Sequence, residues 1–234
     1  LVMADGTESL AANVTASSNM RDCAPQDLVI LALKAHQIAP VIDEICSLLG
    51  EHTIVLTTQN GLPWWYFQRH GGPHDGHVIK ALDPHGEISR RIGPERIIGC
   101  IAYPAAEIAA PGFIKHVEGY RFPVGELNGE ETQRATAISD IFVGAGFKSP
   151  ILADIRAEIW LKAWGNLSFN PISALTHATL VDICQFPLSR ALAERMMTEA
   201  QEIAAKLDIT FRVPLEKRIN GAEKVGKHKT SMLQ

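Results

Sequence analysis

The organisation of this chain is clearest from one segment, Glu158-Ile-Trp-Leu-Lys-Ala-Trp-Gly-Asn-Leu-Ser-Phe-Asn-Pro171. Lys162, Asn166 and Asn170 recur at every fourth residue, so on a helix they lie along one stripe. The residues between them are mostly apolar, which predicts a largely buried helix where a lysine and two carboxamides are costly unless something binds them. Such a row is typical of a pocket wall for a small oxygenated ligand. For the lysine alone, a solvated position on an outer face is the alternative.

The chain after this segment is predicted to be helical throughout. Pro171 removes a backbone donor where the polar row ends, so the first helix is expected to stop there. Further helices are expected over residues 172–181, over 188–207 and from about 214. We therefore predict an all-helical domain over residues 153–234.

The chain before the segment is predicted to be an α/β nucleotide-binding domain over residues 1–152. Residues 27–33 and 53–58 are apolar, β-branched runs, typical of parallel strands covered on both faces. An amphipathic helix over 38–49 between them completes a right-handed crossover of a doubly wound, Rossmann-like sheet. The remaining segments are expected to form a hairpin over 78–91, a third apolar strand over 96–103, antiparallel strands over 113–117 and 120–124 and a helix over 131–144. Residues 147–152 are expected to close this domain.

Polar residues follow the first two predicted strands. Lys34 comes directly after the first strand, and Gln59-Asn60-Gly61 follows the second. In open α/β sheets ligands bind beyond the carboxyl ends of the strands, which favours a ligand-binding role for these side chains. The alternatives are that Lys34 marks the exit of its strand into water and that Asn60-Gly61 is an ordinary turn.

Composition excludes several classes of protein. The 234 residues carry a net charge of -4 and a pI near 6.1, which gives no electrostatic case for binding nucleic acid. No apolar run approaches the roughly 20 residues of a membrane span. The four cysteines are scattered without a Cys-x-x-Cys pair, which indicates reduced thiols in a cytoplasmic protein. His74 and His77 lie in a glycine-rich stretch that we interpret as a surface loop, so no metal site is expected.

The two ends indicate that the chain is part of a longer one. It opens without an initiator Met and contains no Gly-x-Gly-x-x-Gly pattern, the usual pyrophosphate-binding start of a dinucleotide domain. We therefore expect the first domain to lack its first strand and glycine-rich loop. The helical domain is expected to be incomplete at its carboxyl end.

Four motifs in order together resemble one family. Lys-x-x-x-Asn-x-x-x-Asn-Pro is similar to the signature of the ketopantoate reductases (2-dehydropantoate 2-reductases), which are two-domain, NADPH-dependent enzymes of pantothenate biosynthesis. Three further segments resemble that family, namely Val29-Ile-Leu-Ala-Leu-Lys-Ala-His36, Gln59-Asn60-Gly61 and Ser231-Met-Leu-Gln234. The resemblance implies reduction of ketopantoate, a small 2-oxo acid, by NADPH, with the active site in the cleft between the two domains.

The resemblance also implies roles for individual residues. Lys34, Asn60 and the backbone of Ala106 would contact the cofactor. Lys162 would donate the proton to the nascent alkoxide. Asn166 and Asn170 would orient the hydroxyl and carboxylate of the substrate, and Ser231 would donate to the carboxylate.

Other functions stay open at this stage. Leu180 stands where the family usually carries an asparagine, which would suit a different, less polar 2-oxo acid. A 3-hydroxyacid dehydrogenase related to 6-phosphogluconate dehydrogenase would share the Lys and first Asn, but not the second Asn-Pro. A cofactor-binding sensor without turnover is the third alternative.

The most aromatic segment, residues 62–67, contains two of the four tryptophans. It is expected to pack in the core or a subunit interface rather than over the nicotinamide. A homodimer would form through this segment or through the last helices.

Overall fold

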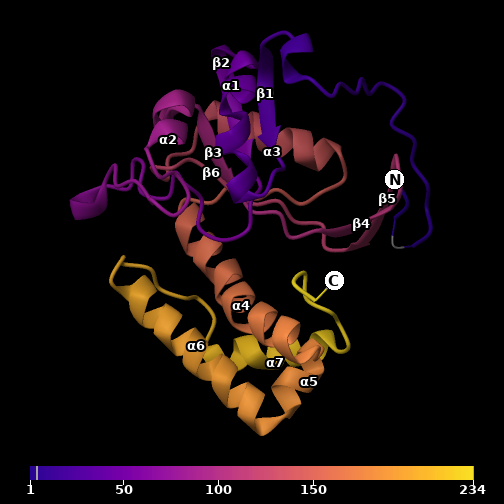
Figure 1. The fold of residues 1–234 in the computed structure, drawn as a ribbon, viewed down its shortest axis with the longest axis vertical. Helices are drawn as coiled ribbons and strands as arrows, with labels where there is room; N and C mark the ends of the chain where they lie inside the picture. The colour runs from indigo at the N-terminus through magenta and orange to yellow at the C-terminus, as the bar shows by residue number, and fades with distance from the viewer. Residues whose placement is uncertain (4, 234) are drawn as a thin grey trace. The chain divides into compact units, whose positions relative to one another are not determined.

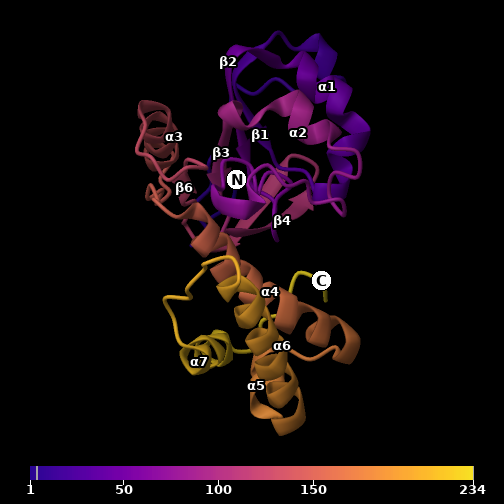
Figure 2. The ribbon, with the colours of Figure 1, turned by 90° about the vertical axis from the view of Figure 1, so that its left-hand side faces the viewer.

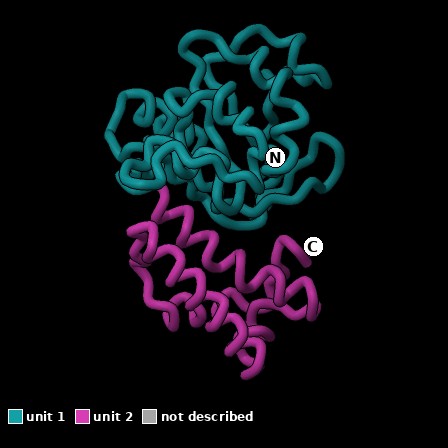
Figure 3. The backbone as a smooth tube through the Cα atoms, turned by 60° about the vertical axis from the view of Figure 1, so that its left-hand side comes forward, with its two compact units in different colours: residues 1–155 teal, residues 156–234 magenta. Residues whose placement is uncertain are grey.

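The computed structural model describes residues 1–3 and 5–233. It divides into two compact units, residues 1–155 and 156–234, drawn in different colours in Figure 3. Among the described residues, every strand lies in unit 1, and unit 2 is built from helices.

The sheet of unit 1 has the order β1-β2-β3-β6. The strands β1 (Gln26–Leu31), β2 (Leu49–Thr57) and β3 (Ile97–Cys100) run parallel, while β6 (Val124–Gly125) is antiparallel to β3. The predicted parallel strands are thus confirmed. Their β-branched residues supply the core, where Val55, Ile97 and Ile98 are almost fully buried.

Helices cover both sides of this sheet. The helices α1 (Ile42–Ser47) and α2 (Glu87–Ile92) lie on one side, and α3 (Gln133–Gly144) lies on the other (Figure 1, Figure 2). The apolar residues of α3 pack on the sheet in one cluster, which consists of Leu56, Ile98, Cys100, Val124, Ala135 and Ile138. This is the layered, Rossmann-like arrangement that the sequence predicted.

The hairpin predicted over residues 78–91 is wrong, because part of this range is the helix α2. Ile88 and Ile92 are four residues apart and both are buried, which is helical spacing. The carboxylate of Asp83 accepts hydrogen bonds from the backbone N–H groups of Ile88 (3.1 Å) and Ser89 (2.9 Å). The turn at Asp83 therefore starts a helix rather than a second strand.

The strand pairing predicted for residues 113–124 also needs correction. β5 (Phe113–Glu118) pairs with β4 (Ala105–Ala110) in a separate two-stranded sheet, and β6 joins the main sheet instead. The strand β4 was not predicted because its sequence is rich in alanine, which is not typical of strands. Pro111-Gly112 makes the turn between β4 and β5. Gly112 has φ +78°, which favours glycine there.

Unit 2 is built on α4 (Ile155–Thr176), α5 (Leu180–Gln185), α6 (Pro187–Ala205) and α7 (Leu215–Val225). The predicted interruption at Pro171 is wrong, since α4 continues through this proline for five more residues. Packing of its apolar side stabilises the helix on both sides of the proline, where Phe169 and Ile172 are buried. Trp164 is fully buried, donates its indole N–H to the Met197 carbonyl (2.7 Å) and stacks on Phe211.

The first residue of α4 belongs to unit 1 and lies in its core. A Cβ added to Gly99 of β3 would lie 2.9 Å from Ile155 Cγ1, and one added to Gly125 of β6 would lie 3.2 Å from Ile155 Cβ. The two glycines therefore admit Ile155 close to the sheet. The rest of α4 lies in unit 2, so no loop separates this anchor from the helix.

Candidate functional site

The polar row of unit 2 lies on α4 as its spacing predicts. Lys162, Asn166 and Asn170 are all half-buried, while Trp164 and Phe169 of the same helix are buried. Because α4 is helical throughout this range, the three polar side chains lie on successive turns of one face. An ammonium and two carboxamides can donate to and accept from an oxygenated ligand along that face.

Ser231 joins this row from the other end of unit 2. The Asn170 carboxamide nitrogen donates to the Ser231 hydroxyl oxygen at 3.4 Å, across 61 residues of sequence. Two of the residues expected to bind one substrate are thus brought together. Because Ser231 accepts this bond, its own O–H can still donate to a carboxylate.

The backbone before Ser231 is held by the first turn of α5. The N–H of Leu180 donates to the His228 carbonyl (3.1 Å), and the N–H of Val181 donates to the Gly226 carbonyl (3.1 Å). These are N–H groups that the first turn of a helix leaves without an intrahelical partner. Leu180, where the family usually has asparagine, therefore anchors the segment that presents Ser231.

A buried carboxylate lies one turn before Lys162 on α4. Glu158 is 5% exposed and accepts from the Arg212 guanidinium at 2.9 Å. Sequence reasoning missed this ion pair. The available signal was an acidic residue four positions before the lysine in an apolar helix.

In unit 1, Lys34 and Asn60 follow adjacent parallel strands. The Thr58 hydroxyl (3.2 Å) and the Gln59 carboxamide nitrogen (2.7 Å) both donate to the Leu31 carbonyl, which fixes the ends of β1 and β2 to each other. Lys34 and Asn60 themselves are exposed. The parallel pairing therefore brings the two predicted cofactor contacts to one edge of the sheet.

The residues at this edge fit a nicotinamide nucleotide. The Gln59 side-chain oxygen is buried and has no hydrogen-bond partner among residues 1–3 and 5–233. A buried acceptor of this kind suits a ligand that brings an N–H donor, such as an amide. The ammonium of Lys34 and the carboxamide of Asn60 add groups that bind phosphate and hydroxyl oxygens.

Ala106 lies six residues beyond the carboxyl end of β3, the strand next to β2 in the sheet. It is exposed on β4 and pairs with His116 of β5 in the two-stranded sheet. Gln234, the last residue of the predicted Ser-Met-Leu-Gln segment, lies outside the described residues.

The aromatic segment is confirmed as part of the core. Trp64, Trp65 and Tyr66 are at most 3% exposed, and Trp65 donates to the Thr57 hydroxyl (2.9 Å). Because these rings are buried, they are not available as a subunit interface. His74 and His77 are exposed around Phe67, and no group of three metal-ligating side chains occurs within residues 1–3 and 5–233.

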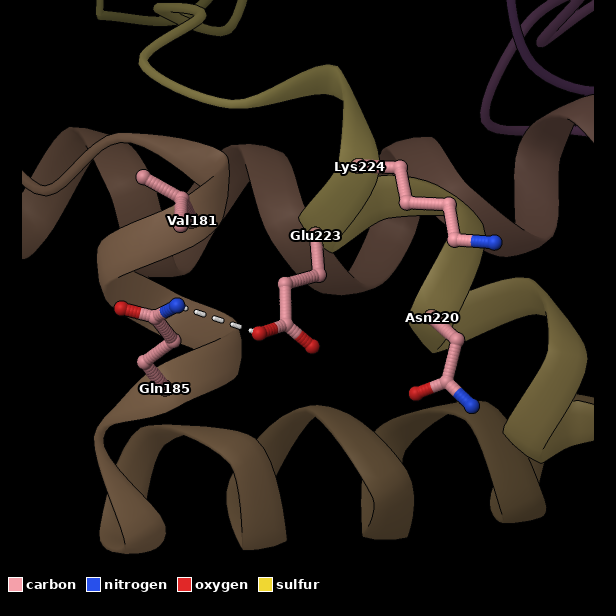
Figure 4. Close-up of a pocket in the computed structure, with 5 residues that line it drawn as sticks. All are labelled: Val181, Gln185, Asn220, Glu223 and Lys224. Carbon is pink, nitrogen blue, oxygen red and sulfur yellow. Dashed lines mark hydrogen bonds between the residues drawn. The ribbon is translucent and has the colours of Figure 1, made fainter.

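A cavity of about 500 Å³ lies between α5 and α7 (Figure 4), lined by Val181, Gln185, Asn220, Glu223 and Lys224. The Gln185 carboxamide donates to Glu223 across it (3.2 Å). None of the predicted site residues lines this cavity, so it is distinct from the row on α4.

Two family models match most of the chain. The model described as "Ketopantoate reductase PanE/ApbA" matches residues 2–129, and the model described as "Ketopantoate reductase PanE/ApbA C terminal" matches residues 154–234. The second match contains the α4 row and Ser231, while the first contains Lys34, Asn60 and Ala106.

Individual proteins show the same likeness. A 2-dehydropantoate 2-reductase of Mesorhizobium japonicum is 53% identical over 98% of this chain and 70% of its own length. The crystal structure of a provisionally assigned ketopantoate reductase from Ralstonia solanacearum has a TM-score of 0.90 at 36% identity, covering 94% of this chain and 68% of the other. The structure of a 2-dehydropantoate 2-reductase from Geobacter metallireducens has a TM-score of 0.75 at 25% identity, covering 91% and 65%.

Proposed function

This chain belongs to the ketopantoate reductase family, and from that premise we propose how its own residues carry the reaction. The reaction is the reduction of 2-dehydropantoate to pantoate by NADPH, a step of pantothenate biosynthesis. The protein is thus an oxidoreductase with a small-molecule substrate.

The proposed roles follow the chemistry of a 2-oxo acid. The cofactor, when bound, supplies a hydride to the carbonyl carbon of the substrate. The Lys162 ammonium donates a proton to the carbonyl oxygen as it becomes an alkoxide. Asn166 and Asn170 orient the hydroxyl and the carboxylate, and the Ser231 hydroxyl donates to the carboxylate. Lys34, Asn60 and the backbone of Ala106 hold the cofactor.

One observation supports these assignments most. The Asn170 carboxamide donates to Ser231, and Asn170 lies two turns after Lys162 on the same face of α4. A carboxylate held at the Asn170–Ser231 pair would therefore lie along the row that begins at Lys162. A 2-oxo acid has its carbonyl next to its carboxylate, so it suits such a row.

The test is the absorbance of the reduced nicotinamide during single turnover of the full-length protein with ketopantoate. We expect Lys162→Met to slow the reduction by about 10²- to 10⁴-fold, the usual contribution of a positioned acid. Lys217→Met, which removes an exposed lysine of α7, is the control and should leave the rate unchanged. A Lys162→Met protein with the wild-type single-turnover rate would remove Lys162 from the mechanism.

The same assay separates the alternatives for the substrate. Reduction of another 2-oxo acid but not of ketopantoate would indicate that Leu180 has changed the specificity. Binding of NADPH without reduction of any 2-oxo acid would indicate a sensor.

We also propose a homodimer that forms through α6. Its outer face carries the exposed Leu188, Leu192 and Ile203, with Arg195 and Glu199 on the same stripe. An antiparallel pairing of two copies would bring Arg195 of each helix toward Glu199 of the other. Light scattering after size exclusion should give twice the chain mass, and Leu192→Lys should halve it, whereas Leu175→Lys outside this face should not.

We place the protein in the cytoplasm. All four cysteines are free thiols, and within residues 1–3 and 5–233 no helix is both long and apolar enough to cross a membrane. Fractionation of the source cells should recover the NADPH-dependent activity with the cytoplasmic markers. Recovery with another compartment would contradict this placement.

A further inference from the structure

Gly165 is an unusual residue for the interior of α4. Glycine is the least favourable helix residue after proline, and it lies between Lys162 and Asn166 in the polar segment. Its surroundings give a reason for its presence. A Cβ added to Gly165 would lie 3.2 Å from Cζ of Arg218 and closer still to Nη2, so an alanine would displace this guanidinium.

The other helical glycine of this unit with a comparable position, Gly221, has no such close neighbour. Gly221 lies in α7, one turn after Arg218, and a Cβ added there would meet no atom within 4 Å. Only the first of these two glycines is thus needed for close approach. The half-buried Arg218 extends from α7 to lie directly against the backbone of α4.

This guanidinium lies against the turn of α4 that follows the proposed proton donor. Residues three apart on a helix are neighbours, so Gly165 and Lys162 lie on the same side of α4 within one turn. The charged groups near this turn include Glu158 on α4 and Arg212, which pairs with Glu158 at 2.9 Å. Arg218 therefore adds a positive charge at a place where a carboxylate and a lysine already lie.

We propose that Arg218, admitted by Gly165, is a positioning residue that acts on Lys162 through its fixed positive charge. This inference rests on the proposed role of Lys162 as proton donor. A neighbouring positive charge disfavours the protonated form of a lysine, which makes its ammonium a stronger acid. Reduction needs that acid, because the proton must pass to the nascent alkoxide.

The first experiment measures Lys162 directly, without activity. Lysine labelled with ¹³C at the ε position is titrated by NMR in the full-length protein, and Lys162→Met assigns the signal. We expect Arg218→Gln to raise the pKa of Lys162 by about one unit relative to the wild type, because the like charge is gone. Arg218→Lys keeps the charge and should restore most of the wild-type value.

The glycine variants provide a matched pair. Gly165→Ala should displace the guanidinium and raise the pKa of Lys162 in the same direction as Arg218→Gln. Gly221→Ala makes the same change in an open part of α7 and should leave the titration of Lys162 unchanged. If Arg218→Gln leaves the titration unchanged, or Arg218→Lys behaves like Arg218→Gln, the inference is wrong.

The second experiment is the pH profile of kcat/KM for reduction of ketopantoate. Activity needs the protonated lysine, so a higher pKa in Arg218→Gln should move the alkaline limit of the profile to higher pH by about one unit. A raised KM with an unmoved alkaline limit would instead mean that Arg218 contacts the substrate, and would overturn the inference. An inactive wild type whose Lys162 titration still responds to Arg218→Gln would contradict the proposed function alone.

Discussion

Glu126 shows how unit 1 stabilises a buried charge. Its side chain is 3% exposed and accepts from Arg134 Nε (2.6 Å), Arg134 Nη2 (2.5 Å) and the Thr132 hydroxyl (2.6 Å). Burial alone raises the pKa of Glu126, but the hydrogen bonds from Arg134 and Thr132 outweigh it and hold the pKa below its usual range. The carboxylate is therefore ionised in the folded protein near neutral pH.

Removal of the arginine should leave this carboxylate buried without its ion-pair partner. We expect Arg134→Met to lower the free energy of unfolding by about 3–5 kcal/mol, measured by urea denaturation. The double variant Arg134→Met/Glu126→Gln should recover part of that loss, because it removes the unpaired charge. A loss below about 1 kcal/mol for Arg134→Met would mean that water or other groups replace the arginine.

The same group gives a pH dependence of stability. Because the folded-state pKa of Glu126 lies below that of the unfolded chain, its contribution is fully present above about pH 4.3 and is lost as the pH falls through the folded-state value. The wild type should therefore lose stability on acidification below about pH 4. Glu126→Gln should weaken this dependence, and an identical acid transition in both proteins would contradict the assignment.

At the scale of elements, α4 contains a proline in its interior. Pro171 has no N–H to donate to the carbonyl four residues earlier, and its ring restricts the backbone of Asn170. We expect Pro171→Ala to raise the free energy of unfolding by about 1–3 kcal/mol, since proline is about 3 kcal/mol less favourable than alanine in a helix interior. We also expect kcat/KM to fall, because the restored helical bond shifts the carboxamide that contacts Ser231.

Denaturation and steady-state kinetics on the same preparations test this prediction. Leu175→Ala, a change at an exposed position of the same helix, is the control and should alter stability by less than about 0.5 kcal/mol. A Pro171→Ala protein that is less stable than the wild type would show that the proline is favourable in this helix.

Elements whose structure follows from a pattern within their own sequence were predicted well. The strands β1 and β2 follow from β-branched apolar runs, and the α4 row follows from its four-residue spacing. The helix α2 was missed because Asp83-Pro-His-Gly86 was interpreted as the turn of a hairpin. The Asp83 carboxylate instead accepts hydrogen bonds from the first turn of the helix. The continuation of α4 past Pro171 was missed because packing of the following turn, including the buried Ile172, outweighs the local cost of proline.

The site was predicted less completely than the fold for a related reason. Lys162, Asn166 and Asn170 share one helix, so their spacing alone places them on one face. The contact of Ser231 with Asn170 depends on the fold of the whole unit, and only the family resemblance indicated it. The approaches of Arg212 to Glu158 and of Arg218 to Gly165 follow no local pattern, since each joins segments far apart in sequence.

At the scale of the whole molecule, the two units should unfold separately, because each has its own core and two-domain chains commonly deviate from a single transition. Trp64 and Trp65 report on unit 1, while Trp160 and Trp164 report on unit 2. When Trp160 and Trp164 are replaced by phenylalanine, the remaining fluorescence follows unit 1. In that protein, Arg134→Met should lower the urea midpoint of the fluorescence transition by about 1 M or more. When Trp64 and Trp65 are replaced instead, the fluorescence follows unit 2, and Arg134→Met should leave its urea midpoint unchanged. Equal shifts of both midpoints would show that the chain unfolds as one unit.

The continuity of α4 from Ile155 to the polar row has a consequence for how this protein can evolve. Each residue added to a helix turns everything beyond it by about 100° and moves it by about 1.5 Å. An in-frame insertion of one codon between positions 156 and 161 would therefore turn Lys162, Asn166 and Asn170 together away from their present direction relative to Ile155. The exposed loop around residues 70–77 can absorb such a change, but this helical segment has no loop to do so. Its length should thus be fixed among functional descendants of the gene, even where its individual apolar residues drift.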